Sequence, residues 1–168
     1  MSAGAVPRVR EARSDDLPAM LVIYNDVIAT SDAIFTEQPD TLEGRRVWLE
    51  QRRADSRPVL AVELDGELAG FASYGPFRPW PGYRDTVEHS VYVSAWHRRR
   101  GVGRALLTAL IERARDDGKH VMLAGIDGGN DASLEFHASQ GFVRVGHLPE
   151  VARKGERLLD LVFMQLTL

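Results

Sequence analysis

The segment Trp96–Leu110, WHRRRGVGRALLTAL, places three arginines and a Gly-x-Gly pair directly before a run of good helix formers. The first four amide groups of a helix lack intrahelical partners and carry partial positive charge. Glycines that admit a ligand to the backbone at that point therefore favour an anion such as phosphate. Taken alone, the pair is more typical of a glycine-rich helix cap beside a solvated arginine face.

Two known phosphate-binding loops are excluded by counting residues. A P-loop requires Gly-x-x-x-x-Gly-Lys-Ser/Thr, which the chain does not contain. A dinucleotide-binding turn requires a third Gly or Ala where this chain has Leu106, and an acidic residue about 20 residues further on, where it reads KHVMLAGI. The segment therefore needs another interpretation.

The hydrophobic pattern predicts an α/β (α+β) fold, with a mixed, mostly antiparallel sheet of about seven strands and about four helices on its two faces. Strands are expected at Val6–Ala12, Val59–Gly75 (two strands joined by Asp65-Gly66), Thr86–Val93, Lys119–Asp127, Phe142–Leu148 and Arg157–Leu166. Helices are expected from a Ser14 cap to Thr30, from an Asp40/Glu43 capping box, at Gly101–Asp117 and at Asn130–Ser139. The last two strands are expected to be separated by a polar segment, Pro149–Glu156.

Composition limits the classes of function. The 168 residues, 44% of them hydrophobic, fit a single domain over residues 1–168. A net charge of -3 gives no bulk attraction to nucleic acid or an anionic membrane. No apolar run approaches the ~20 residues that span a bilayer, and Arg8, Arg10 and Arg13 interrupt any N-terminal apolar segment, so a cytoplasmic protein is expected. The absence of cysteine excludes disulfides, thiolate metal sites and a cysteine-bound acyl intermediate.

The pattern Arg98-x-x-Gly101-x-Gly103, between a strand and a helix, resembles the coenzyme A pyrophosphate turn of the GNAT acetyltransferase superfamily. NDASLEFHASQGF, Asn130–Phe142, resembles a later helix of that family, although Asn130 alone would be an ordinary helix cap. The resemblance implies a GNAT fold in which splayed strands bind acetyl-CoA as co-substrate. The residues that it assigns to acetyl-CoA are Val91, Tyr92, Val93, Arg98, Arg99, Arg100, Gly101, Val102, Gly103, Arg104, Asn130 and Ser133.

A longer resemblance runs from about Arg8 to Leu166 and concerns one subfamily. The segments FTEQP, FASYGPFRPWPGYRDTVEHSVYV, AGID, GHLPEV and LDLVFMQL are similar to the phosphinothricin and methionine sulfone or sulfoximine N-acetyltransferases. That resemblance implies acetylation of the α-amino group of a small amino-acid analogue, in a ternary complex within a homodimer. One departure is KGERLLDL, at Lys154–Leu161, where the subfamily usually has KFGRWLDL.

Glu88 is the candidate catalytic base. An attacking amine must lose a proton, and a carboxylate on a strand next to the predicted pantetheine segment could accept it. The alternative is an edge-strand carboxylate paired with Arg78 or Arg84. His137 stands where the family usually has tyrosine, and it either donates a proton to the leaving thiolate or only packs. The backbone N–H of Val93 is expected to meet the oxyanion.

The acceptor site is expected to lie in the loops around the sheet opening. Arginines suit a carboxylate and a tetrahedral phosphinate or sulfone group, and aromatic side chains suit the walls. The residues expected to bind the substrate are Phe35, Glu37, Arg78, Tyr83 and Arg84, with Phe77 and Trp80 as further walls. Surface arginines and loop-packing aromatics are the alternative reading. His89 and His120 have no metal-ligand spacing, so no metal is expected.

Two rival functions remain. An N-acetyltransferase for another small amine, or for a larger acceptor such as a protein N-terminus or an aminoglycoside, would share the acetyl-CoA site. An aminoglycoside pocket should carry carboxylates, whereas PFRPWPGYR is basic and aromatic. A non-catalytic acyl-CoA-binding sensor is the rival from another class, and retention of Glu88 and His137 argues against it.

Overall fold

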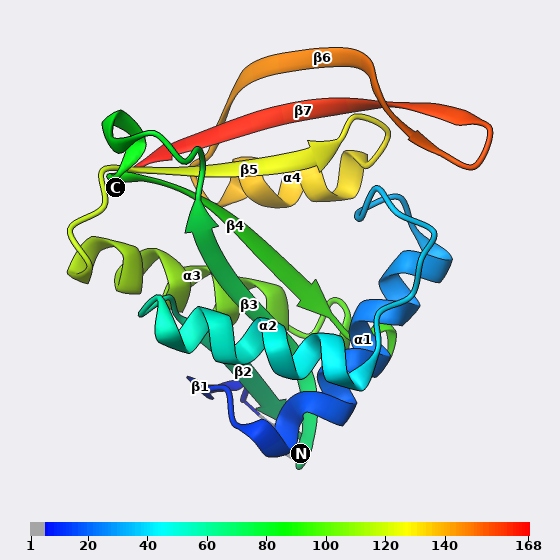
Figure 1. Cartoon of the computed structure of the whole chain (residues 1–168), viewed down its shortest axis with the longest axis vertical. Helices are drawn as coiled ribbons and strands as arrows, with labels where there is room; N and C mark the ends of the chain where they lie inside the picture. Colours follow the sequence, from blue (N-terminus) through cyan, green and yellow to red (C-terminus); the bar gives the residue numbers. More distant parts are fainter. Residues whose placement is uncertain (1–5) are drawn as a thin grey trace, which may run out of the picture. The chain divides into compact units, whose positions relative to one another are not determined.

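The computed structural model describes residues 6–168 (Figure 1). These residues contain four α-helices and seven strands, whose order in the sheet is β1-β2-β3-β4-β5-β7-β6. They form two compact units. Unit 1 comprises the described residues up to Tyr24, with Asp40–Tyr74 and Ser90–Arg113, and unit 2 comprises Asn25–Pro39, Gly75–His89 and Ala114–Leu168.

Unit 1 is built around an antiparallel ladder. Strand β1 (Arg8–Glu11) pairs with β2 (Val59–Leu64), which pairs with β3 (Glu67–Pro76) through the predicted turn at Asp65 and Gly66. The unit also holds α2 (Leu42–Ala54), the first half of α1 (Leu17–Thr30) and most of α3 (Val102–Asp116). Its core residues include Met20, Leu49, Ala61 and Phe71, which are fully buried.

Unit 2 is built around the second half of the sheet. Strand β5 (Val121–Asp127) pairs in parallel with the start of β4 (Thr86–Val93) and antiparallel with β7 (Arg157–Thr167). Strand β6 (Val143–Lys154) forms a hairpin with β7, and α4 (Asp131–Ser139) lies alongside β5 (Figure 1). The core side chains of this unit include Met122, Ala124, Ile126, Val162 and Met164.

The predicted fold class is confirmed, with a mixed sheet and four α-helices among the described residues. The predicted Ser14 cap is wrong, because Ser14 opens a short 3-10 turn and α1 begins only at Leu17. The predicted capping residue Asp40 is wrong by one position. The hydroxyl oxygen of Thr41 accepts the hydrogen bond from the Gly44 amide, 3.0 Å away.

The predicted polar separator Pro149–Glu156 is also wrong, because strand β6 continues to Lys154. Pairing with β7 resumes at Ala152 after a register shift, and Glu150 adopts a φ of 54° within the irregular segment. A bulge of this kind lets a strand pass a proline without losing its partner. The separator shrinks to the two-residue turn at Gly155 and Glu156.

No helix of the described residues is long and apolar enough to cross a membrane. The single-domain range includes residues 1–5, which lie outside the described residues, and it stays a prediction, as does the cytoplasmic location.

Candidate active site

The turn before α3 has the geometry that its glycines predicted. Gly101 has a φ of +82°, which residues with a Cβ rarely adopt. Its carbonyl accepts a hydrogen bond from the amide of Ala105 at 2.9 Å. The amides of Val102, Gly103 and Arg104 therefore form the first turn of a fifteen-residue helix, where no intrahelical acceptor exists. The arginines at 98, 99, 100 and 104 are all exposed around this turn.

Two further contacts in unit 1 define how the predicted coenzyme residues are held. Arg100 forms an ion pair with Asp65 at 2.7 Å, between side chains that are about half exposed. The ring of Tyr92 packs against Tyr24 and Phe71, with ring centroids 5.3 and 5.1 Å apart. Because the Tyr92 ring packs in the core, a coenzyme could contact this residue through its backbone. Val91 and Val93 are partly buried on the same strand.

Glu88, in unit 2, is partly buried on β4 and is paired in register with Leu123 of β5. Burial raises the pKa of its carboxyl above the ordinary value, and the positive charge of Arg78 opposes that rise. A Cβ at Gly125 would lie 2.8 Å from the Glu88 Oε1 atom, so the glycine makes the room that this carboxylate occupies. A carboxyl group with a raised pKa is suited to accept a proton near neutral pH.

The sequence offered Arg78 and Arg84 as alternative ion-pair partners of Glu88, and the structure places the two arginines differently. Arg78 acts on Glu88 electrostatically while its guanidinium lies over the Phe77 ring, 5.1 Å from the centroid. Arg84 is exposed and pairs with its neighbour Asp85 at 3.7 Å.

Asn130, Ser133 and His137 are linked along α4. Asn130 caps the helix, since its Oδ1 atom accepts the amide of Ser133 at 3.1 Å. The Nδ1 atom of His137 donates to the Ser133 carbonyl at 2.7 Å, which places the proton of the neutral ring on Nδ1. The Nε2 atom therefore carries a lone pair. It is buried and has no hydrogen-bond partner among the described residues.

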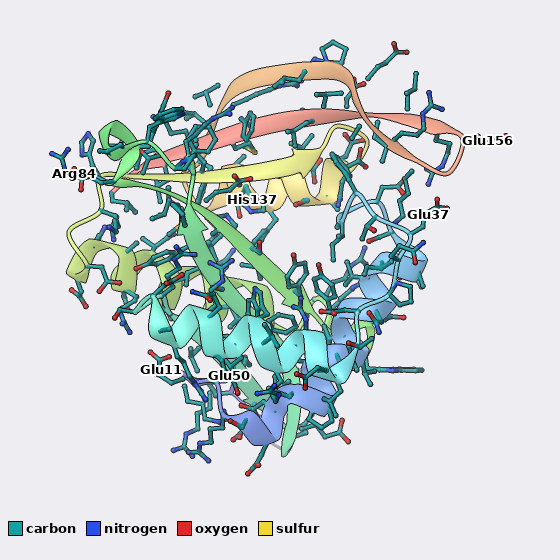
Figure 2. The ribbon with its side chains drawn as sticks, viewed as in Figure 1. Glu11, Glu37, Glu50, Arg84, His137 and Glu156 are labelled. Atoms are coloured by element: carbon teal, nitrogen blue, oxygen red, sulfur yellow. The ribbon has the colours of Figure 1, made fainter. Side chains whose placement is uncertain are left out.

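His137, labelled in Figure 2, is buried and lies among other aromatic rings. Its ring stacks on His89 with centroids 5.1 Å apart and an interplanar angle of 23°, and Phe136 and Phe142 contact its ring edge-to-face. Burial lowers the pKa of His137 and lowers that of His89 to about 3. The neutral ring has one N–H group, which is hydrogen-bonded to the Ser133 carbonyl. His137 is therefore better suited to packing than to donating a proton.

The predicted aromatic walls come together in part. Phe77 makes edge-to-face contacts with Tyr83 and with Phe163, at centroid distances of 5.7 and 5.8 Å. Trp80 and Tyr83 are exposed. Phe35 is partly buried and Glu37 exposed in the loop after α1, where a Cβ at Gly155 would lie 3.4 Å from the Glu37 Oε1 atom.

The comparisons with known proteins decide the family. The family model described as "Acetyltransferase (GNAT) family" matches residues 20–142. The chain belongs to the GNAT acetyltransferase family. The residues matched by the family model include both motifs that resemble this family, the Gly-x-Gly turn and the Asn130–Phe142 segment.

Individual relatives of this GNAT chain carry narrower names. An L-methionine sulfoximine/L-methionine sulfone acetyltransferase of Pseudomonas aeruginosa is 48% identical over 161 residues, covering 95% of this chain and 94% of that protein. A phosphinothricin N-acetyltransferase of Alcaligenes faecalis is 40% identical over 158 residues, covering 94% and 80%. The crystal structure of a phosphinothricin acetyltransferase from Sinorhizobium meliloti in complex with acetyl-CoA matches with a TM-score of 0.92 at 29% identity, covering 99% and 89%.

Three residues beside the predicted site were missed by sequence reasoning. Gly125 lies within the segment AGID, and nothing in the local sequence indicates that a carboxylate approaches it. His89 alternates with polar neighbours like any inward strand residue. Lys154 lies in the segment that the sequence predicts to be a polar separator, although its side chain is buried. Among the described residues no group of His, Cys, Asp and Glu could hold a metal ion.

Proposed function

We propose that this GNAT enzyme transfers the acetyl group of acetyl-CoA to the α-amino group of a small amino-acid analogue of the methionine sulfone, methionine sulfoximine or phosphinothricin type. The observation that carries the proposal is Glu88, a partly buried carboxyl group with a raised pKa, on the strand that continues into Val91–Val93. The names of the relatives, at up to 48% identity over nearly the whole chain, support the class of acceptor.

Acetyl-CoA would be held by backbone groups and arginines. The free amides at the start of α3, with Arg98, Arg99, Arg100 and Arg104 exposed around them, suit a pyrophosphate. The backbone of Val91–Val93 would pair with the pantetheine arm, which fits the packing of the Tyr92 ring into the core. Asn130 already caps α4 through Oδ1, so its side-chain NH2 is the part that could contact the coenzyme.

Glu88 would take a proton from the acceptor's ammonium group, directly or through one water molecule. The neutral amine then attacks the thioester carbonyl, and the N–H of Val93 would stabilise the oxyanion. Collapse of the tetrahedral intermediate breaks the carbon–sulfur bond and releases coenzyme A thiolate. Because the chain has no cysteine, no acyl group rests on a protein thiol. His137 would hold α4 in place by packing rather than protonate the thiolate.

The acceptor's carboxylate and its tetrahedral group would be met by Arg78 and Arg84, with Phe35, Phe77 and Tyr83 as walls and Glu37 beside the amine. Two contacts support this assignment. The Phe77 ring contacts Tyr83, and the guanidinium of Arg78 lies over the Phe77 ring, so two aromatic rings and one arginine lie close together. We further propose that the chain acts as a single-domain homodimer in the cytoplasm, without a metal.

Steady-state release of coenzyme A thiol from acetyl-CoA tests the proposal. The acceptor panel contains phosphinothricin, methionine sulfone, methionine sulfoximine, free methionine, one aminoglycoside and one peptide. Saturable turnover confined to the first three compounds supports the proposed class. Turnover on the peptide or the aminoglycoside alone contradicts it, and binding of acetyl-CoA without turnover on any compound favours the sensor.

A further inference from the structure

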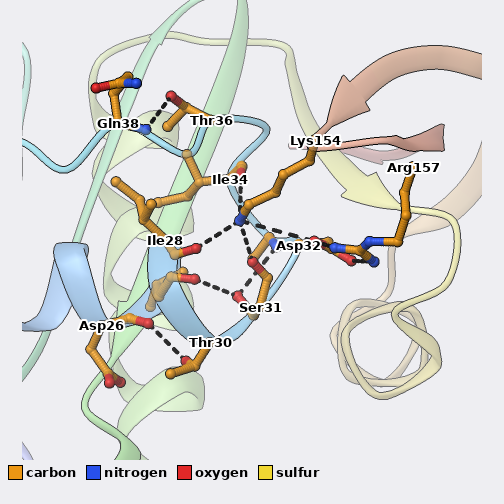
Figure 3. Close-up of polar contacts among 12 residues, drawn as sticks. Asp26, Ile28, Thr30, Ser31, Asp32, Ile34, Thr36, Gln38, Lys154 and Arg157 are labelled. Carbon is orange, nitrogen blue, oxygen red and sulfur yellow. Dashed lines mark hydrogen bonds and ion pairs between the residues drawn. The ribbon is translucent and has the colours of Figure 1, made fainter.

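The side chain of Lys154, at the end of β6, is buried against backbone carbonyls of a distant part of the chain (Figure 3). Its Nζ atom donates to the carbonyls of Ile28 at 2.7 Å, Ser31 at 2.6 Å and Ile34 at 3.3 Å. An ammonium group has three N–H donors and no acceptor, so three carbonyls match its donors in number. Lys154 therefore fixes the path of the chain as it leaves α1.

The first of these contacts also explains why a cation is tolerated there. Helix α1 ends at Thr30, and the last four carbonyls of a helix have no intrahelical donor. The carbonyl of Ile28 is one of them. A positive charge at a helix C-terminus is stabilised by the helix dipole, and the three carbonyls replace the water that Lys154 loses on burial.

A second cation stands directly opposite Lys154. Arg157 is its register partner across the β6–β7 turn, and it forms a bidentate ion pair with Asp32 at 2.5 and 2.7 Å. Like charges at opposed positions of a hairpin repel, but Asp32 also lies 3.9 Å from the Lys154 Nζ atom and offsets both charges. We call Lys154 and Arg157 the hairpin anchor, and residues 31–39 the loop that it holds.

The two-residue turn between the anchor residues brings the hairpin close to the same loop. Gly155 has a φ of +57°, which a glycine adopts without strain, and its missing Cβ would lie 3.4 Å from the Glu37 Oε1 atom. Glu37 and Glu156 lie at the same end of unit 2 (Figure 2). The hairpin therefore bonds to the first part of loop 31–39 and lies close to Glu37 further along it.

We infer that Lys154 is a positioning residue for acceptor recognition: it holds loop 31–39 so that Phe35 and Glu37 are presented to the amino-acid substrate. The inference rests on the proposed function, because it takes these two residues to contact the acceptor. Lys154 donates all its hydrogen bonds to backbone, so it contributes to acceptor affinity through the loop and not by touching the substrate. The acetyl-CoA residues in unit 1 lie outside the contacts of the anchor.

The variant Lys154→Met tests the inference, because it keeps a long apolar stem and removes the charge and the donors. We expect the KM for the best acceptor of the panel to rise roughly tenfold or more, with kcat and the KM for acetyl-CoA changed by less than about threefold. Amides of loop 31–39 should exchange with deuterium faster. Lys154→Arg, which retains donors and charge, should recover part of the acceptor KM.

Arg153→Met is the matched control, since Arg153 is the exposed neighbour whose guanidinium donates to the Glu156 carbonyl within the same turn. It should leave both KM values and the loop's exchange unchanged. Faster exchange in Lys154→Met with an unchanged acceptor KM overturns the inference. The inference is also overturned if Lys154→Met lowers kcat, raises both KM values and lowers Tm together. Absence of turnover by the wild-type enzyme instead overturns the proposed function, and the two failures are thereby distinguished.

Discussion

The stacked histidines predict that the protein loses stability on mild acidification. His89 is neutral in the folded protein because burial lowers its pKa from 6.5 to about 3, and His137, stacked on it, is shifted in the same direction. In the unfolded chain His89 binds a proton below about pH 6.5. Between about pH 6.5 and pH 3 the unfolded state therefore binds more protons, so the free energy of unfolding falls as the pH falls through this window.

The size of the stability loss follows from the lowered pKa of His89. At about pH 5 the unfolded imidazole lies about 1.5 units below its pKa, and each unit corresponds to about 1.4 kcal/mol, so His89 alone removes about 2 kcal/mol relative to pH 7.5. Other groups also titrate over this range. The informative quantity is therefore the difference between the wild-type protein and His89→Leu, which cannot be protonated at this position.

Urea unfolding at about pH 7.5 and about pH 5 measures the difference. We expect the loss of unfolding free energy between the two values to be about 2 kcal/mol smaller in His89→Leu than in the wild type, whatever the variant's stability at pH 7.5. His120→Leu, which removes an exposed imidazole, serves as the control and should keep the wild-type loss. Equal losses in the wild type and His89→Leu would refute the buried neutral histidine.

Three further predictions concern the site. Gly125→Ala places a Cβ 2.8 Å from the Glu88 carboxylate, and the displaced base should reduce kcat/KM roughly tenfold to a hundredfold in the coenzyme A release assay. Arg78→Leu removes the positive charge that lowers the pKa of Glu88, so the acid limb of the kcat/KM profile should move to higher pH. Arg100→Glu reverses a charge beside the predicted pyrophosphate turn, and the Kd for acetyl-CoA measured by calorimetry should rise roughly tenfold.

Each of these variants has a control. Gly146→Ala adds a methyl whose nearest neighbour is 3.8 Å away, and it should leave kcat/KM unchanged. Arg84→Leu removes an exposed charge that pairs with Asp85, and the acid limb should stay in place. Asp65→Asn breaks the same ion pair as Arg100→Glu without a charge reversal, and it should change the Kd for acetyl-CoA by less than about threefold. A variant indistinguishable from its control contradicts the corresponding assignment.

Local signals in the sequence predicted the features that depend on local geometry. The turn at Gly101 is one such feature, because a positive φ favours glycine whatever surrounds it. The hairpin turn at Asp65 and Gly66 is another, since two flanking runs of alternating residues need a short reversal. The placement of the first two helix starts was less accurate, because neighbouring polar side chains such as Asp40 and Thr41 compete for the same free amides.

Features that depend on packing between distant segments were not predictable from the sequence. The polar stretch around Lys154 looked like a loop, yet residues 152–154 pair with β7, and the Lys154 side chain donates to the Ile28 carbonyl at the end of α1. The departure KGERLLDL falls on this hairpin, at Gly155, Glu156 and Leu158, and leaves Lys154 and Arg157 in place. Likewise, His137 is neutral because it is buried, and neither that burial nor its stacking on His89 is revealed by spacing on a single helix.

The role of Glu88 as the base is tested most directly by comparing the kcat/KM of the wild-type enzyme and of Glu88→Gln on the best acceptor of the panel. Calorimetry measures the acetyl-CoA affinity of both proteins. Glutamine keeps the shape of the side chain and cannot act as the base. We expect kcat/KM to fall roughly a hundredfold or more in Glu88→Gln, with nearly unchanged acetyl-CoA affinity. An unchanged kcat/KM in Glu88→Gln would contradict this role.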